Sequence, residues 1–391
     1  MKLGIIGDLH YSATSPRVGH LLEVLDWVID DGKHLGVTEW ALAGDICEGA
    51  PIGNEYGPLV KRITRLGRVF IALGNHCVHD ALDWWNHLNG SVHVASRSFI
   101  HDPCGETSIL VIPYPRRGHA PFDNLKADTI PESMRAAAER IGQTIKAALE
   151  CSREIDEARP VIGIGHFTIQ GMTTRDTAFE LHHATEVIVP QTALAGLAFM
   201  AVGHIHTAQW LCPSCGTWNH DGVESCRCGA HHLTARVVGV GDLIRNDFAE
   251  INDPKSYTVV TVENGQLSWE RRQVPAREMA TLHIEWTNPS VHLAEIEAFA
   301  ATCGGKEVKV TVEIPADRLA TYDPVLFAPI SARAAYFAPI DRRVISIDRV
   351  RAPELKTAEG IGDELIAWLN ASNQQIEDER RQRLVALAEA L

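Results

Sequence analysis

The chain of 391 residues lacks the features that mark membrane, secreted and repeat proteins. No window holds the roughly 18 uninterrupted apolar residues that a membrane-spanning helix needs, and the first residues show no secretory signal pattern. Internal repeats and low-complexity segments are also absent from the sequence. We therefore expect a cytoplasmic protein without membrane association. Because the chain is too long for one ordinary core, we expect two domains with short additions.

Basic residues and regularly spaced cysteines are scarce. Lys and Arg number 36 against 50 Asp and Glu, which gives a formal net charge of −14. Because phosphate contacts normally dominate affinity for nucleic acid, this charge argues against DNA binding by the whole surface. Bound dications or local arginine clusters could still reverse the potential at one site. Five of the nine cysteines are scattered singly, which is typical of a reducing compartment and not of a disulfide framework.

Against this background, five short motifs stand out because each follows an apolar run that reads as a strand. The runs are residues 3–7, 37–43, 68–73, 161–164 and 198–202. The motifs are Asp8-Leu9-His10, Gly44-Asp45, Gly74-Asn75-His76, Gly165-His166 and Gly203-His204-Ile205-His206. Since α/β sheets carry their chemistry at the carboxyl ends of strands, we expect the motifs to converge.

The side chains in these motifs match the ligands of a two-metal phosphoesterase centre. Two divalent cations held about 3.5–4 Å apart can clamp both the attacking and the leaving oxygen of a displacement at phosphorus. Asp45 is the expected bridge, because a carboxylate can bind one metal through each oxygen. His76 is expected to stay free of metal and either to stabilise the developing charge or to protonate the leaving oxygen. The remaining ligands would be Asp8, His10 and His206 for one metal, and Asn75, His166 and His204 for the other.

Each motif also has a purely structural interpretation. Alone, Gly44-Asp45 is more often a turn than a metal site, and a single His166 is more often a hydrogen-bonded histidine than a ligand. Five motifs in this order, each after an apolar strand, reduce the structural interpretation to roughly one in twenty.

An insert at residues 211–232 carries the four remaining cysteines, in the pairs Cys212-Pro-Ser-Cys215 and Cys226-Arg-Cys228. Two close thiolate pairs suit a tetrahedral zinc ion in a closed, structural site. Unliganded loop cysteines are the alternative, at about one in ten. Stapling a loop that is too small for its own core is the simplest role. Because the insert begins soon after His206, it could also shape the substrate channel or contact nucleic acid or a partner.

The rest of the chain divides into segments with different strand-like and helix-like sequence patterns. Asn264-Gly265 between two strand-like runs predicts a hairpin. We predict a catalytic domain over residues 1–275, a small α/β unit over 281–350 and a helical tail over 353–391.

On these motifs the chain resembles the calcineurin-like metallophosphoesterases over about residues 1–275. A narrower resemblance, to the SbcD-type nuclease subunit of the bacterial double-strand-break repair complex, rests on other segments. Residues 187–190 and Leu194 resemble that family's approach to its second histidine motif. Gly241-Asp242 and residues 245–250, leading into a strand at 256–263, resemble the stretch that follows it.

The resemblance implies a four-layer α/β/β/α sandwich, with residues 281–350 as a capping domain that meets DNA. It implies a manganese-dependent exonuclease and endonuclease that acts on DNA ends in DNA repair; Mg, Fe or Zn could also fill the sites. It further implies a homodimer that works with an SbcC-like coiled-coil ATPase. The tail at 353–391 could bind that ATPase or, equally, pack on its own domain.

One departure from the family concerns the residue after the Asn-His motif. The family usually carries an aspartate there, and this chain has Cys77. A carboxylate that orients the His76 imidazole would then have to come from Asp80 or Asp83.

Two other functions remain open at this level. The acidic composition favours a phosphoesterase of the same kind that acts on a small-molecule or protein phosphoester. A non-catalytic adaptor would use the insert and the tail for binding, but intact ligands at all seven metal positions argue against it.

Overall fold

The structure is a computed structural model, and it describes residues 1–49, 53–77, 82–88, 91–95, 97–101, 107–115, 129–157, 159–173, 186–345, 360–371 and 378–389. The chain divides into two compact units. The first comprises Met1–Ala280, Cys303–Val308 and Ala334–Phe337, and the second comprises Thr281–Thr302, Lys309–Arg333 and Ala338–Leu391. Among the described helices, none combines the length and the apolar character that crossing a membrane requires.

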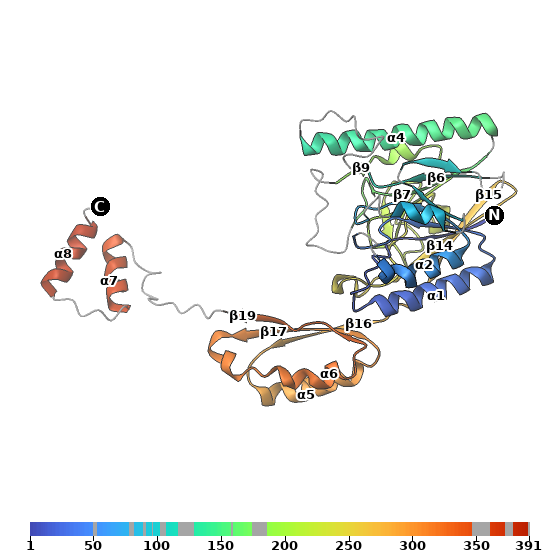
Figure 1. Cartoon of the computed structure of the whole chain (residues 1–391). Helices are drawn as coiled ribbons and strands as arrows, with labels where there is room; N and C mark the ends of the chain where they lie inside the picture. Colours follow the sequence, from blue (N-terminus) through green and yellow to red (C-terminus); the bar gives the residue numbers. More distant parts are fainter. Residues whose placement is uncertain are drawn as a thin grey trace. The chain divides into compact units, whose positions relative to one another are not determined.

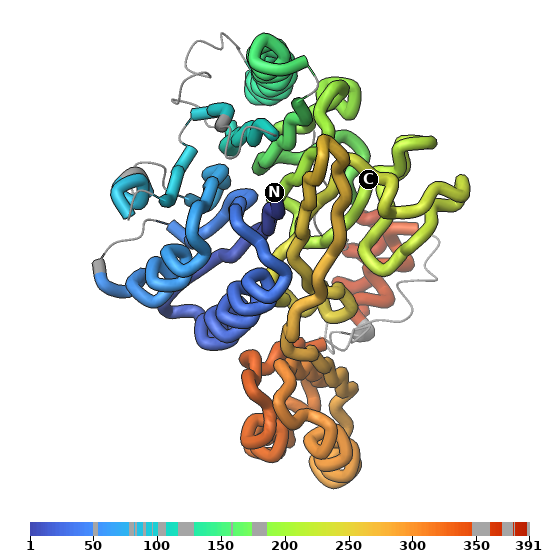
Figure 2. The backbone as a smooth tube through the Cα atoms, turned by 90° about the vertical axis from the view of Figure 1, so that its right-hand side faces the viewer, coloured from blue at the N-terminus to red at the C-terminus, as the bar shows by residue number. Residues whose placement is uncertain are grey.

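A six-stranded sheet in the first unit has the order β15-β14-β1-β2-β3-β4. Its strands are β1 (Lys2–Ile6), β2 (Glu39–Ala43), β3 (Arg68–Ala72), β4 (Val92–Ala95), β14 (Ser256–Glu263) and β15 (Gln266–Gln273). The strands from β1 to β4 are parallel to one another, so their carboxyl ends lie at one edge of the sheet. The hairpin of β14 and β15 turns at Asn264 and Gly265, both with positive φ, as the sequence predicts (Figure 2).

A seven-stranded sheet has the order β12-β11-β13-β10-β7-β6-β5. Its strands are β5 (Phe99–His101), β6 (Ser108–Ile112), β7 (Val161–His166), β10 (Phe199–Gly203), β11 (Gln209–Leu211), β12 (Trp218–His220) and β13 (Val237–Gly239). The central strands β6, β7, β10 and β13 are parallel. Beside this sheet, β8 (Thr168–Ile169) and β9 (Ile188–Val189) form a short parallel pair.

The two sheets bury apolar side chains between them, and helices cover their other faces (Figure 1). The helices are α1 (Val18–Leu35), α2 (Gly57–Ile63) and α4 (Ile130–Ile155). Side chains along β1 alternate between the two faces of the first sheet. Leu3 and Ile5 join the core between the sheets, whereas Ile6 joins the core under α1. Ile141 and Ile145 of α4 pack on the second sheet. The predicted α/β fold class is confirmed.

In a small sheet, most of whose residues belong to the second unit, β17 (Glu307–Pro315) lies between β16 (Met279–Glu285) and the strands β18 (Tyr336–Phe337) and β19 (Asp341–Ile345). The helices of this unit are α5 (Pro289–Thr302) and α6 (Ala328–Ser331), and Ile284, Ile296, Val312 and Phe327 are buried. Two further helices, α7 (Ile361–Ala371) and α8 (Asp378–Glu389), contact each other. Short 3-10 helices occupy Gly53–Tyr56, Thr64–Leu66, Asp83–His87, Gln191–Leu194, His232–Thr234, Phe248–Glu250, Ala316–Thr321 and Pro324–Phe327.

A buried histidine on α1 makes the stability of the first unit depend on pH. His20 is 4% exposed, and its Nε2 accepts a hydrogen bond of 2.9 Å from the backbone N–H of Arg277. Burial, followed by the charge of Arg277, lowers the pKa of His20 from 6.5 to about 4. As the pH falls from 6.5 towards 4, the unfolded chain therefore binds a proton that the folded chain does not, and the folded state loses stability.

We expect this group to remove about 2 kcal/mol of unfolding free energy between pH 7 and pH 5. Urea denaturation of the parental protein and of His20→Gln at both pH values measures it, since the glutamine cannot titrate. Identical pH dependence of the two proteins would contradict the assignment.

Candidate metal centre

The five motifs meet where strands of both sheets end. Asp8, Asp45 and Asn75 follow β1, β2 and β3 of the first sheet, whereas His166 ends β7 and His204 follows β10 of the second. The side chains form two groups whose potential ligand atoms lie within 4.8 Å of one another. The first group is Asp8, His10 and His206, and the second is Asp45, His166 and His204. Asn75 adjoins the second group, because its Oδ1 lies 3.0 Å from both His166 Nε2 and His204 Nδ1. All seven residues proposed from the sequence as metal ligands are thus brought together.

Asp45 lies between the two groups. Its Oδ2 is 3.1 Å from His166 Nε2 and 3.9 Å from His10 Nε2. Its Oδ1 accepts a hydrogen bond of 2.8 Å from the backbone N–H of His76. A carboxylate in this position can reach a cation in each group, which is the geometry that a bridging ligand needs.

The backbone at these positions is held in an unfavourable conformation. Among the described residues, positive φ outside glycine occurs at Asp8 (35°), His10 (46°), Asp45 (41°), His204 (87°) and Asn264 (53°). The first four belong to the motifs that are predicted to bind metal. Such conformations cost about 1–3 kcal/mol each and persist only where the surrounding structure enforces them. The surrounding fold therefore holds these side chains in their orientation at a cost in stability.

The glycines of the motifs allow the ligands to approach one another. A Cβ atom on Gly44, whose φ is 100°, would lie 1.8 Å from Nδ1 of His166. A Cβ atom on Gly74 would lie 2.0 Å from Oδ1 of Asp45. Both distances are far below van der Waals contact, so a side chain at either position would push a ligand away from the centre.

Each of the four imidazoles is anchored at one ring nitrogen by a carboxylate or carbonyl oxygen. Nδ1 of His166 lies 2.7 Å from the carbonyl oxygen of Ala43, and Nδ1 of His10 contacts Oε1 of Glu48. The other two anchors are Glu186, 2.9 Å from His204 Nε2, and Glu250, 3.1 Å from His206 Nδ1. Carboxylate or carbonyl partners on the nitrogen that does not bind the metal are typical of metal-binding histidines, because they fix the ring and its tautomer.

Behind Glu250 lies a buried ionic cluster. Lys255 is 3% exposed, and its Nζ donates to Oδ1 of Asp242 and, over 2.8 Å, to Oε2 of Glu250. Burial raises the pKa of Glu250, but its hydrogen bond to His206 and the charge of Lys255 outweigh that effect and lower it to about 2. Glu250 therefore remains a carboxylate that can hold Nδ1 of His206.

The carboxylates make the centre a strongly attractive place for cations. Burial by itself would lower the pKa of His166, but Asp45 and Asp8 outweigh it and raise the pKa to about 9. Burial acts in the same way on His206, where Glu250 and Asp242 raise the pKa to about 10. In the absence of metal, the site thus compensates its negative charge with protons on the imidazoles. The donor set of carboxylate, imidazole and amide fits two divalent cations.

A divalent cation must displace these protons, since only the neutral ring is a ligand. We therefore expect the apparent affinity for Mn²⁺ to keep rising between pH 7 and about 9, by about tenfold per pH unit for each proton displaced. Isothermal titration calorimetry in buffers of different ionisation enthalpy measures both the affinity and the proton release. An affinity that is constant above pH 7 would contradict the expectation, because imidazoles of ordinary pKa are already neutral there.

His76 is in neither of the two ligand groups, but its ring lies edge-on to that of His10, with the ring centroids 5.0 Å apart, and the two histidines form with Glu48 a third group that could hold a metal ion. The side chain of His76 is 45% exposed, and its Nδ1 lies 3.0 Å from Oε2 of Glu48. The hydrogen bonds to His10 and His76 lower the pKa of Glu48 to about 2, so this carboxylate is charged. Glu48 thus holds both His10 of the first group and the imidazole of His76. The sequence suggested Asp80 or Asp83 as the carboxylate that orients His76, but Asp80 and the side chain of Asp83 lie outside the described residues. Cys77, which stands where the family usually has an aspartate, is buried.

Sequence reasoning missed the anchoring residues Glu48, Glu186 and Lys255. Glu48 carries a weak signal, because it stands three residues after Asp45 in the same strand-to-loop segment. Glu186 and Lys255 carry none, since neither belongs to a motif. Glu250 lies in a segment that the sequence singled out only for its resemblance to a nuclease family.

The four cysteines of the insert also come together. Sγ of Cys212 lies 3.4 Å from Sγ of Cys228, and Sγ of Cys215 lies 3.6 Å from Sγ of Cys226. All four sulfur atoms lie within 4.8 Å of one another. Tetrahedral zinc with Zn–S bonds of about 2.3 Å places its sulfur ligands roughly 3.8 Å apart. The cysteine cluster therefore has the dimensions of a four-sulfur zinc site.

The sequence matches the family model described as calcineurin-like phosphoesterase over residues 1–208. No curated protein matches the sequence. Among solved structures, a dimetal phosphatase from Danio rerio is similar at 10% identity, with 70% of this chain and 96% of that chain covered and a TM-score of 0.42. GAP50, described as the anchor in the inner membrane complex of Plasmodium, is similar at 9% identity, with 70% and 84% covered and a TM-score of 0.39.

The family assignment rests on the family model, which spans more than half of the 391 residues. The structural similarities are too weak to add to it. The family expected from the metal motifs is confirmed, and so is the reaction class. The chain belongs to the calcineurin-like phosphoesterases and is a phosphoester hydrolase.

Proposed function

We propose that this hydrolase is a metal-dependent nuclease that cleaves phosphodiester bonds at DNA ends, in DNA repair or end processing. The observation that supports it most is the position of residues 242–250, the segment similar to SbcD-type nucleases, next to the metal centre. Asp242 and Glu250 of this segment hold the buried Lys255, and Glu250 anchors a ligand imidazole. The segment that carries the nuclease resemblance is thus part of the support of the metal centre.

The cofactors and partners are proposed with this function. We assign manganese to the pair of sites, with Mg, Fe or Zn as substitutes, and one structural zinc ion to the four cysteines. DNA is the expected substrate, and the SbcC-like ATPase and a second copy of the chain are the proposed partners. A cytoplasmic location follows from the same proposal.

The residues of the site suggest a division of labour in the reaction. The two divalent cations, when bound, would stabilise the phosphoryl oxygens and lower the pKa of a water molecule. Asp45 and the anchored imidazoles fix the positions of the ligand atoms. Glu48 accepts the Nδ1–H of His76 and so leaves Nε2 to face the substrate. From there, His76 can give a proton to the leaving oxygen.

A phosphoesterase that acts on a small-molecule or protein phosphoester is the second candidate. The net charge of −14 favours it, because an acidic surface repels a polyanionic strand away from the metal centre. The metal chemistry of the two candidates is the same, so only the substrate separates them.

A direct comparison of substrates tests the proposal. Linear double-stranded DNA with blunt and overhanging ends is compared with p-nitrophenyl phosphate and bis-p-nitrophenyl phosphate, each with manganese, magnesium or chelator. We expect manganese-dependent shortening of DNA that the chelator abolishes and that an Asp45→Ala preparation lacks. Hydrolysis of the p-nitrophenyl esters together with intact DNA would reject the nuclease and favour the second candidate.

A further inference from the structure

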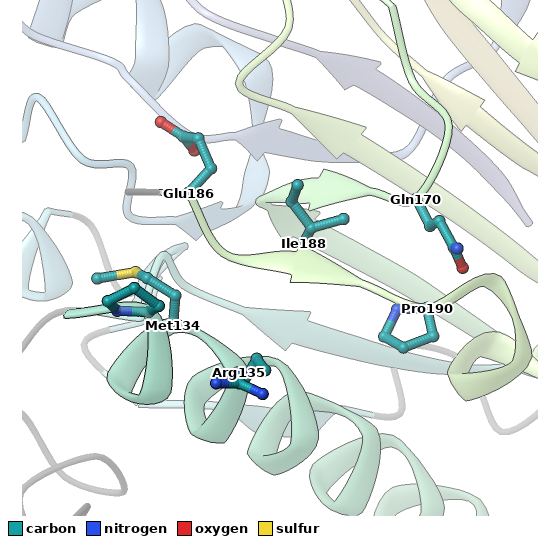
Figure 3. Close-up of a pocket in the computed structure, with 7 residues that line it drawn as sticks. Met134, Arg135, Gln170, Glu186, Ile188 and Pro190 are labelled. Carbon is teal, nitrogen blue, oxygen red and sulfur yellow. The ribbon is translucent and has the colours of Figure 1, made fainter. Parts of the chain in front are cut away.

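A pocket of about 520 Å³ lies between helix α4 and strand β9 of the first unit. Met134 and Arg135 line it from the helix, and Ile188 and Pro190 line it from the strand and the residue that follows. In Figure 3, Glu186 and Gln170 appear on opposite sides of Ile188. The volume falls within the range of pockets that hold small organic groups, about 300–1,000 Å³.

Glu186 connects this pocket to the metal centre. The residue lines the pocket, and its Oε2 lies 2.9 Å from Nε2 of His204. Nδ1 of the same ring faces Asn75, which adjoins the second ligand group. A single imidazole therefore separates the pocket wall from the place where a phosphoester would be hydrolysed.

The lining suits a flat, uncharged group with polar edges. Met134, Ile188 and Pro190 offer apolar surface on which a ring can lie. Arg135 and Glu186 carry opposite formal charges, so the pocket has no net attraction for a second phosphate. Together with Gln170, these side chains supply donors and acceptors for the edge of a ring. A nucleobase has this combination of an apolar face and a polar edge.

The four-cysteine insert supports one wall of the pocket. Nε1 of Trp218, between the two cysteine pairs, donates over 3.0 Å to the carbonyl oxygen of Gln170. Nε2 of Gln191 donates to the same carbonyl over 3.0 Å and to the carbonyl of Gly216 over 3.1 Å. Trp218 also lies against Gly171, where an added Cβ would be 3.2 Å from its ring. The insert thus holds Gln170 directly, through Trp218, and it holds Gln191, the residue after Pro190, through Gly216.

We propose that this pocket receives a nucleobase next to the scissile phosphodiester, and that the four-cysteine insert holds the pocket wall through Trp218. The inference rests on the proposed nuclease function, and it names the part of the substrate that the site recognises. It gives the insert a role in substrate positioning beyond stapling its own loop.

Two variants that fill the pocket from opposite walls, Ile188→Trp and Met134→Trp, test the proposal. Lys146→Trp is the matched control, because Lys146 is an exposed residue of the same helix that does not line the pocket. In the manganese-loaded protein, calorimetry compares the affinity for deoxyadenosine monophosphate with that for inorganic phosphate. The ratio of DNA cleavage to hydrolysis of bis-p-nitrophenyl phosphate is measured on the same samples.

We expect the parental protein and the control to bind the nucleotide about tenfold more tightly than phosphate, the contribution of one stacked base. In both filled variants, the preference and the cleavage ratio should fall by about the same factor. Trp218→Phe removes the hydrogen bond to Gln170 but keeps an aromatic ring, so it should lose part of the preference while its zinc content stays at one ion per chain.

The outcomes separate the two proposals. DNA cleavage with an unchanged cleavage ratio and nucleotide preference in both filled variants overturns the pocket assignment and leaves the nuclease. A nucleotide preference that the filled variants lose, in a protein that does not cut DNA, keeps the pocket and rejects the nuclease. An unchanged preference in both Trp218→Phe and Trp218→Ala overturns the role of the insert.

Discussion

Replacing Asp45 with alanine is expected to empty both metal positions and to abolish hydrolysis of every phosphoester. Asp45 lies between the two ligand groups, because its Oδ2 contacts His166 of one group and His10 of the other. If two cations are bound as predicted, its removal would take a ligand from each of them at once. The loss should therefore exceed the 10–100-fold that is typical for partners outside the ligand shell. Inductively coupled plasma mass spectrometry measures the metal content, and hydrolysis of bis-p-nitrophenyl phosphate measures the rate.

Asp30→Ala provides the matched control, because this carboxylate is 61% exposed on α1 and contacts only Arg65 and Lys33 among the ion pairs of the described residues. It should keep both cations of the metal centre, besides the proposed structural zinc, and the parental rate. Circular dichroism of both variants checks that the fold survives. Two cations bound at the metal centre of folded Asp45→Ala would mean that the bridge lies elsewhere. That result would also remove the basis for the proposed chemistry.

The convergence of the candidate ligands could be predicted from the sequence because each follows a strand with a simple signal. A short apolar run that ends in a glycine and a polar residue identifies the strand end, and parallel strands bring such ends to one edge. Asp8, Asp45 and His166 are found in this way, although nearly two hundred residues separate the first motif from the last. The cysteine pairs are equally local, since their spacing alone suggests the cluster.

The supporting residues could not be predicted, because they act through packing and not through local pattern. No repeating sequence pattern connects Glu186 with His204, which it contacts in the fold. Lys255 reaches Glu250 only after the chain has folded. The aspartate that the family carries after its Asn-His motif is missing, and Glu48 contacts His76 from another loop. A formal charge of −14 is likewise an average over the sequence. It does not indicate that an arginine lines the pocket beside the metal centre.

Replacing His76 with alanine is expected to reduce turnover to a small residual rate and to leave both metals in place. The imidazole is 45% exposed and shares Glu48 with His10, but it belongs to neither of the two ligand groups. Loss of a general acid typically lowers the rate by about 10²–10⁴-fold. We expect kcat to fall by this factor with little change in KM, and the metal content to match that of the parental protein. Loss of metal equal to that of Asp45→Ala would contradict the separation of roles.

A double variant then shows whether Glu48 acts through His76. If its only task is to orient this imidazole, His76→Ala with Glu48→Gln should be no slower than His76→Ala alone, because the two changes remove the same function. Glu48 also contacts Nδ1 of His10, so a further loss in the double variant would report on the metal site. Metal content decides between these explanations. A further loss with both metals retained would place Glu48 itself in contact with the substrate, whereas a loss of one metal would assign it to the support of His10.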